Sequence, residues 1–259
     1  MNFLSKFGIG AGAAVSPSRE VTLPIPTNGA RSRTPGAAPP TAAGAVAATR
    51  SSDPRESNRV SNGLKELLWN LDGLGRGTLL DLGPAWQTTL SFFIERGFRV
   101  SSEDILREWK DFLVEEETKL RAAAAAGNLL QSVDATPPGR ATRFLAENLQ
   151  YPNSTFDAIL LWDLLDYLEP SLAKLVVASL TDLLRAGGVV FAMFHSKKPD
   201  GFHRYRVADS NTLQMISSPV LCPAQKIYQN REIQDLFGRY RTMKSFIGRD
   251  QLRESLFIK

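Results

Sequence analysis

The stretch Thr78-Leu79-Leu80-Asp81-Leu82-Gly83-Pro84 decides the fold. A short apolar run that ends in a Gly-Pro pair is typical of a buried strand followed by a tight turn. A strand that is apolar along its whole length is buried on both faces, as in a parallel sheet covered by helices. Residues 88–96 follow with apolar side chains at helical spacing, so the stretch predicts a strand–turn–helix unit.

Further strand and helix signals alternate along the rest of the chain. Periodicity predicts helices over 62–71, 88–96, 105–127, 170–185 and 230–240, with Asn62 as the N-cap of the first. Strands are predicted at 78–82, 98–102, 143–145, 156–162 and 189–194, and residues 128–141 are predicted to be a loop. The pieces 246–248 and 256–258 indicate an antiparallel finish. This order predicts an α/β fold with a Rossmann-like, doubly wound, mostly parallel sheet.

Residues 1–60 differ in composition from the remainder. They are rich in Ala, Gly, Pro, Ser, Thr and Arg, and their last aromatic residue is Phe7. Such a segment buries too little apolar surface to offset the entropy of ordering it. We therefore expect a disordered, basic tail over 1–60 and one domain over 61–259.

The charge distribution limits the classes of partner. The formal net charge is +4, and residues 1–60 carry all of this excess, so the domain is neutral. A neutral domain does not predict a broad phosphate-binding surface. One cysteine, Cys222, forms neither an internal disulfide nor a zinc site. We expect no export signal and no membrane span, and hence a cytoplasmic protein.

The loops after the strands are where a ligand should bind, because open α/β sheets bind ligands beyond the carboxyl ends of their strands. The turn at Gly83 follows the first strand, and Glu103 lies 20 residues further on. This spacing is typical of a carboxylate that meets ribose hydroxyls in nucleotide sites. We expect Glu103 to bind ribose and Asp104 to cap the next helix.

Four ordered motifs resemble one family. They are Leu80-Asp81-Leu82-Gly83-Pro84-Ala85, Glu103-Asp104, the run from Leu149 to Asp157, and Leu184-Arg185-Ala186-Gly187-Gly188. Together they resemble class I S-adenosylmethionine-dependent methyltransferases of the type 11 kind, over residues 62–195. The resemblance implies a seven-stranded sheet with one antiparallel strand, and S-adenosylmethionine as the cofactor. The glycine-rich loop is degenerate, since Ala85 and Gln87 stand where the family usually has glycines.

The resemblance also implies roles for individual residues. The methionine and ribose side of the cofactor would be lined by Asp81, Gly83, Pro84 and Ala85, with Glu103 on the ribose hydroxyls. The adenine would be flanked by Asp104 or Ile105 and approached by Glu147 and Asn148. The cofactor and the substrate would be faced by Trp162 and Asp163.

No catalytic residue follows from the motifs. The candidates near strand ends are Asp163, Asp166, Tyr167 and His195, of which Asp163 and His195 are retained. We expect Asp163 to orient or cap, and His195 to be solvated beside the lysines that follow it. The run Glu115–Glu117 predicts a solvated helix face rather than a metal site. The basic and aromatic stretch 202–206 predicts an edge strand or a lid rather than a nucleic-acid surface.

The leading hypothesis is methyl transfer from S-adenosylmethionine to an unidentified acceptor that is small or peptide-like. A catalytically inactive binding or scaffold protein with this fold is the alternative, motivated by the degenerate loop. A weaker alternative is an RNA-modifying methyltransferase that uses the tail and residues 202–206 for phosphate contact.

Overall fold

The computed structural model describes residues 56–125, 136–248 and 250–259. The predicted disorder of residues 1–55 and the first part of the predicted loop 128–141 lie outside these residues. Glu56–Val60, which the sequence assigned to the tail, forms a strand, β1, within the folded unit.

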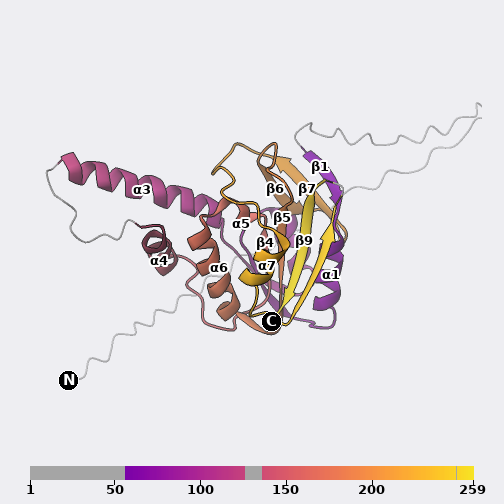
Figure 1. Ribbon diagram of the computed structural model, residues 1–259. Coiled ribbons are helices and arrows are strands. Elements are labelled where there is room, and N and C mark those ends of the chain that lie inside the picture. The colour runs from indigo at the N-terminus through magenta and orange to yellow at the C-terminus, as the bar shows by residue number, and fades with distance from the viewer. Residues whose placement is uncertain (1–55, 126–135, 249) are drawn as a thin grey trace, which may run out of the picture. The chain divides into compact units, whose positions relative to one another are not determined.

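The larger sheet has the strand order β3-β2-β4-β5-β9-β8 (Figure 1). Its strands are β2 (Gly77–Asp81), β3 (Phe98–Ser102), β4 (Phe156–Trp162), β5 (Leu184–His195), β8 (Thr242–Ile247) and β9 (Leu252–Ile258). Neighbours from β3 to β5 are parallel, whereas β9 runs antiparallel to both β5 and β8. The predicted doubly wound sheet with an antiparallel C-terminal strand is therefore confirmed.

The strand predicted at 143–145 is wrong, because these residues lie in helix α4 (Pro137–Glu147). Thr136 caps this helix by accepting a hydrogen bond from the Gly139 N–H at 3.3 Å, and prolines suit a first helical turn. Ala141 and Phe144, three residues apart, then face the core. Among the described residues the sheet has six strands rather than the seven that the resemblance implies.

Helices cover both faces of this sheet. One face carries α1 (Asn62–Leu71) and α2 (Gln87–Ile94), and the other carries α3 (Ile105–Ala125), α4, α5 (Leu164–Tyr167), α6 (Pro170–Leu183) and α7 (Asn230–Leu236). Each face has its own buried apolar cluster, which explains why β2 and β4 are apolar throughout. The cap of α1 is Ser61, whose hydroxyl accepts from the Leu64 N–H at 2.9 Å, and not Asn62 as predicted.

A second, antiparallel sheet has the order β1-β7-β6, with β6 at His203–Val207 and β7 at Thr212–Ser217. A buried carboxylate, Glu254 of β9, attaches this sheet to the larger one. It accepts from Arg59 Nη1 of β1 and from the Gly63 N–H of α1, both at 2.6 Å. On the other side, the Val207 N–H of β6 donates to the Thr89 hydroxyl of α2 at 3.0 Å. These contacts fix β6 beside the larger sheet.

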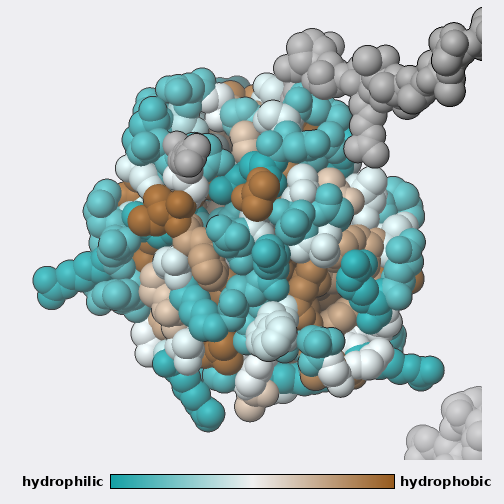
Figure 2. Space-filling view, turned by 90° about the vertical axis from the view of Figure 1, so that its right-hand side faces the viewer, coloured by the Kyte–Doolittle hydropathy of each residue, from teal (hydrophilic) through white to brown (hydrophobic). Residues whose placement is uncertain are grey.

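The side of the molecule that carries β1 and α1 in Figure 1 is mostly hydrophilic, with separate hydrophobic patches (Figure 2). Its exposed apolar side chains include Val60 and Trp69. Scattered apolar residues of this kind are ordinary on a protein surface. No helix within the described ranges is long and apolar enough to cross a membrane.

Candidate functional site

The switch point of the strand order lies between β2 and β4. The chain passes from β2 to β3 on one side and then crosses to β4 on the other side of β2. Ligands of open α/β sheets bind at such a point, beyond the carboxyl ends of the strands. The loops that flank it begin at Leu82, after β2, and at Asp163, after β4. The structure thus brings together two of the segments that the sequence singled out.

Asp81 and Trp162 meet at this point. The indole Nε1 of Trp162 donates to Asp81 Oδ1 at 2.7 Å, and the Gly83 N–H donates to the same oxygen at 3.0 Å. The other carboxylate oxygen, Oδ2, is buried and has no partner within the described residues. Burial raises the pKa of Asp81 to about 6, although both hydrogen bonds oppose this rise.

Gly83 is required by the position of the Trp162 ring. A Cβ atom at Gly83 would lie 2.7 Å from the indole Nε1. The indole therefore fills the space that this glycine leaves beside the turn. Trp162 itself has a φ of 52°, an unfavourable value for a bulky residue that is typical of strained functional positions.

Glu103 and Asp104 follow β3 at the same edge of the sheet. The Glu103 carboxylate contacts the hydroxyl of Tyr151, and the pKa of this tyrosine is raised to about 12 by burial and then by Glu103. Asp104 caps α3 as expected, with Oδ1 accepting from the Arg107 N–H at 3.3 Å. Its carboxylate also lies 3.0 Å from Nη2 of Arg204, a residue of β6.

Other residues predicted for the cofactor lie in less enclosed places. Ala85 is exposed in the turn, whereas Pro84 borders the cleft at the switch point. Glu147 is exposed at the end of α4, and the Asn148 side chain donates to the Phe144 carbonyl at 2.8 Å. The adenine contacts expected of Glu147 and Asn148 stay predictions.

Strand β6 closes the cleft at the switch point. The Tyr205 ring stacks on Trp162 with 6.1 Å between centroids and an interplanar angle of 10°. Its hydroxyl donates to Asp163 Oδ2 at 3.2 Å. Together with Phe202 and Arg204, Tyr205 leaves a cavity of only about 20 Å³ beside Gly83.

The stretch 202–206 is the edge strand that the sequence predicted. Arg204 pairs with Asp104, and Arg206 pairs with Glu56 at 3.1 Å. Phe202 is buried, as is Tyr205. Side chains that are buried or already paired do not present a surface for single-stranded nucleic acid.

His195 is not solvated, which contradicts the interpretation based on its lysine neighbours. Its side chain is 12% exposed, and Asp166 Oδ2 lies 2.9 Å from Nδ1 and accepts from the backbone N–H at 2.7 Å. Asp163 Oδ2 lies 3.9 Å from Nε2. Burial opposes the charge on His195, but the two carboxylates outweigh it and raise the pKa of the imidazole above its ordinary value.

Asp163 and Asp166 are both buried in this cluster. Burial raises the pKa of Asp163 to about 7, and burial also raises that of Asp166. A cavity of about 150 Å³ lies beside His195 and is bordered also by Lys197, His203 and Asp250. The cluster is therefore a titratable centre at the carboxyl edge of the sheet.

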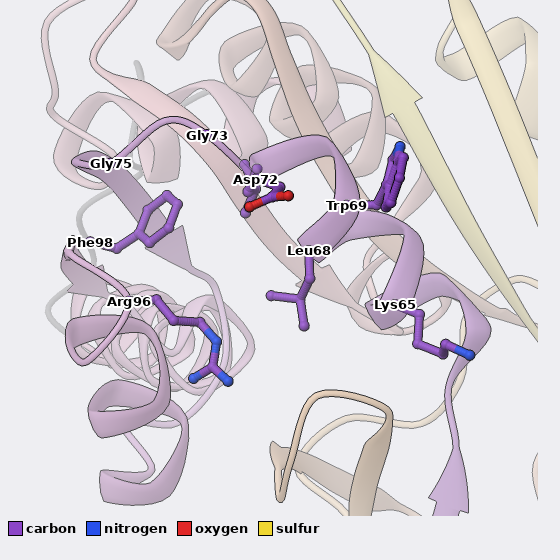
Figure 3. A pocket seen from close by; sticks show the side chains of 9 residues that line it. Lys65, Leu68, Trp69, Asp72, Gly73, Gly75, Arg96 and Phe98 are labelled. Carbon is purple, nitrogen blue, oxygen red and sulfur yellow. The ribbon is translucent and has the colours of Figure 1, made fainter.

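A larger cavity, of about 570 Å³, lies at the opposite edge, beside the start of β2 and β3 (Figure 3). Leu68 and Arg96 extend into it, whereas the Trp69 ring is turned away. Arg96 is held by Phe92, over whose ring it lies at 3.5 Å and to whose carbonyl it donates at 2.7 Å. Since the switch-point loops open on the other edge, this cavity is not the candidate cofactor site.

The predicted solvated helix face holds for two residues of the acidic run Glu115–Glu117, because Glu115 and Glu117 are exposed, whereas Glu116 is half-buried and pairs with Arg143 of α4 at 2.5 Å. Glu115 pairs with Lys119 and Glu117 with Arg121, both one turn along α3. In the parts of the chain that the structure describes, no group of three His, Cys, Asp or Glu side chains is placed to hold a metal ion.

Two residues at the carboxyl edge of the sheet were not predicted as site residues from the sequence. They are Tyr151, which contacts Glu103, and the buried Arg253 of β9. Tyr151 lies inside a quoted motif, so its proximity to the Glu103 strand end could have been suspected. The signal for Arg253 was a charged residue beside apolar Leu252 in a final strand that ends in Leu256-Phe257-Ile258.

No family model and no curated protein matches the chain. Solved methyltransferase structures are similar to it. A 1,6-didemethyltoxoflavin-N1-methyltransferase from Burkholderia thailandensis, with bound 1,6-didemethyltoxoflavin and S-adenosylhomocysteine, is 17% identical, covers 77% of this chain and 79% of its own, and has a TM-score of 0.39. An S-adenosylmethionine-dependent methyltransferase from Mesorhizobium loti is 13% identical, covers 75% of this chain and 96% of its own, and has a TM-score of 0.41. Another from Aquifex aeolicus is 13% identical, covers 77% of this chain and 90% of its own, and has a TM-score of 0.39.

We expect Asp81→Asn to gain stability relative to the native chain as the pH rises. The raised pKa of Asp81 means that its contribution to stability is complete below about pH 4 and is lost as the pH rises through about 6. A rise from 3.8 to about 6 corresponds to about 3 kcal/mol at alkaline pH. Urea unfolding of both proteins at pH 4.5 and pH 8 measures the difference.

Asp157→Asn is the matched control, because the pKa of Asp157 is shifted in the direction opposite to that of Asp81. Burial raises the pKa of Asp157, but Arg185 and Thr78 lower it by more. The carboxylate therefore contributes stability that is lost as the pH falls. That loss falls below about pH 4, so the stability difference between D157N and the native chain should stay nearly constant between pH 4.5 and pH 8. A D81N difference that stays constant across this pH range would contradict the raised pKa.

Proposed function

We propose that the chain is an S-adenosylmethionine-dependent methyltransferase. The observation that carries the proposal is the sheet order, in which antiparallel β9 lies between β5 and β8, combined with a buried, half-unpaired Asp81 at the switch point. The resemblance of the sequence motifs also implies a sheet with one antiparallel strand, of which six strands lie in the part of the chain that the structure describes.

The carboxylates of Asp81 and Glu103, which accept hydrogen bonds at the carboxyl edge of the sheet, fit this cofactor. The unpaired Oδ2 of Asp81 suits the ammonium group of the methionine part, because a buried carboxylate oxygen without a partner is costly. The Glu103 carboxylate, at the end of the neighbouring strand, can accept two ribose hydroxyls. Asp81 and Glu103 would therefore hold the two polar ends of the methionine–ribose unit.

The cleft beside Gly83 is closed in the structure. Ligand pockets for molecules of this size measure roughly 300–1,000 Å³, whereas the cavity beside Gly83 measures about 20 Å³. Cofactor entry therefore requires Tyr205 to leave its stack on Trp162, with β6 moving away from the larger sheet. The Arg204–Asp104 ion pair is the contact that holds β6 against α3.

His195 is the group best placed to remove a proton from the acceptor. When bound, S-adenosylmethionine supplies an electrophilic methyl group on a sulfonium, which a nucleophile can take. Asp166 holds Nδ1 of His195, so Nε2 is left to accept a proton from the nucleophile. The acceptor would thus be a hydroxyl or nitrogen compound that loses a proton, and the 150 Å³ cavity admits only a small molecule or the end of a larger one.

Calorimetric titration of S-adenosylhomocysteine into the full chain tests the cofactor site. We expect a micromolar Kd, weakened by about 10- to 100-fold in Glu103→Ala because hydrogen bonds to a charged group are lost. Glu95→Ala, the same change at an exposed position after α2, should bind as the native chain does. Absence of binding to both S-adenosylhomocysteine and S-adenosylmethionine would refute the proposed function.

Arg204→Gln should accelerate binding, because it removes one of the contacts that hold β6 beside the larger sheet. A pair worth about 1 kcal/mol predicts an association rate about five-fold higher. Stopped-flow tryptophan fluorescence on mixing with S-adenosylhomocysteine measures this rate. Arg206→Gln is the matched control, since Arg206 pairs with Glu56 within the small sheet. Equal association rates for R204Q, R206Q and the native chain would contradict the closed-cleft interpretation.

A screen of small hydroxyl and amine compounds, with transfer of labelled methyl groups as the readout, tests the role of His195. With an acceptor from this screen, the rate should rise with pH through the raised pKa of His195, because only the neutral imidazole accepts a proton. His195→Gln should lower kcat by about 10²- to 10⁴-fold and remove this pH dependence. His203→Gln, at the other histidine bordering the cavity, should keep the pH dependence.

A further inference from the structure

Two carboxylates compete for the proton of His195. Asp166 Oδ2 lies 2.9 Å from Nδ1, and Asp163 Oδ2 lies 3.9 Å from Nε2. A negative charge on Asp166 keeps the proton on Nδ1 and leaves Nε2 free, whereas a charge on Asp163 favours the opposite tautomer. The identity of the charged carboxylate therefore decides whether His195 can act as a base toward the cavity.

Arg253 introduces an asymmetry between these carboxylates. It lies opposite Phe194 in the β5–β9 ladder, one register position from His195, and it is only 8% exposed. Its Nε and Nη1 atoms are buried without a hydrogen-bond partner among the described residues, and so is Oδ1 of Asp166. A buried guanidinium is tolerated when it faces a negative charge.

The charge of Arg253 acts on Asp166, although the two side chains form no ion pair. Burial raises the pKa of Asp166, whereas its hydrogen bonds and charge interaction with His195, and then the positive charge of Arg253, lower it. Burial also raises the pKa of Asp163, to about 7; the charge of His195 and the hydrogen bond from Tyr205 lower it, whereas the negative charge of Asp166 adds to the rise. Asp163 is consequently the carboxyl group that carries a proton more readily.

We propose that Arg253 is a positioning residue, which fixes the negative charge on Asp166 and thereby selects the His195 tautomer with its proton on Nδ1. The use of the free Nε2 as a base rests on the proposed function, but the tautomer does not. Arg253 touches neither the cavity beside His195 nor the cleft beside Gly83, so it acts through Asp166.

Other charged and titratable groups also surround the imidazole. They are Asp250 in the loop before β9, Lys197 after β5, His203 and Tyr205 on β6, and Tyr167 on α5. Asp250 is paired with Arg59 at 2.8 Å. The positive charge of Arg253, by contrast, acts on Asp166 from within the core.

Nitrogen-15 NMR of the histidine side chains in the full chain tests the proposal. The sequence has two histidines, so His195→Gln and His203→Gln assign both sets of signals. In the native chain we expect the neutral His195 ring to carry its proton on Nδ1. Arg253→Met, an apolar replacement of similar length, should let Asp166 take up a proton and so shift the proton of the neutral His195 ring toward Nε2.

Matched variants separate the charge from the packing. Arg253→Lys keeps the charge and should retain the native tautomer, and Arg185→Met repeats the substitution at an exposed arginine that pairs with Asp157. If R253M does not fold, the neutral variant Arg253→Gln replaces it. A native proton on Nε2, or a neutral variant with unchanged signals, would overturn the proposal. Since no cofactor or acceptor is added, failure of the proposed function leaves this outcome intact.

Discussion

A buried hydrogen bond from the indole of Trp162 to the carboxylate of Asp81 joins the ends of β4 and β2, the two strands that flank the switch point, at 2.7 Å. It places a bulky ring over Gly83, a position where any side chain would collide with it. The ring in turn provides the platform on which Tyr205 of β6 stacks. The closed cleft therefore follows from one contact at the switch point, and opening it must disturb that contact or the stack above it.

The same edge of the sheet concentrates buried acids. Asp81, Asp163 and Asp166 all have raised pKa values because burial disfavours their charge. Apolar residues at these positions would avoid that cost, so the carboxylates are hard to explain by stability alone. Perturbed acids gathered at the ligand-binding edge of an α/β sheet are typical of functional sites.

The sequence predicted the elements whose signal is local. The apolar run before Gly83 and the periodicity of 105–125 each reflect burial that repeats along the chain. Strand β1, with the sequence Glu-Ser-Asn-Arg-Val, has no apolar pattern and is held by pairing with β7, which lies more than 150 residues away. Residues 143–145 misled because three residues cannot distinguish a strand from a helix, whereas the Thr-Pro-Pro cap upstream could.

In the candidate site, too, only the features with a local sequence signal were predicted. The position of Glu103 at the same edge of the sheet as Gly83 was predicted from the spacing between them, because a βαβ unit fixes that distance along the chain. The environment of His195 was not, since its adjacent lysines indicated solvent while its partner Asp166 lies 29 residues earlier. Arg253 comes from the final strand, whose antiparallel insertion beside β5 brings it next to this pair. The surroundings of His195 thus depend in part on the strand that is inserted beside β5, and a sequence pattern confined to the first βαβ unit cannot contain them.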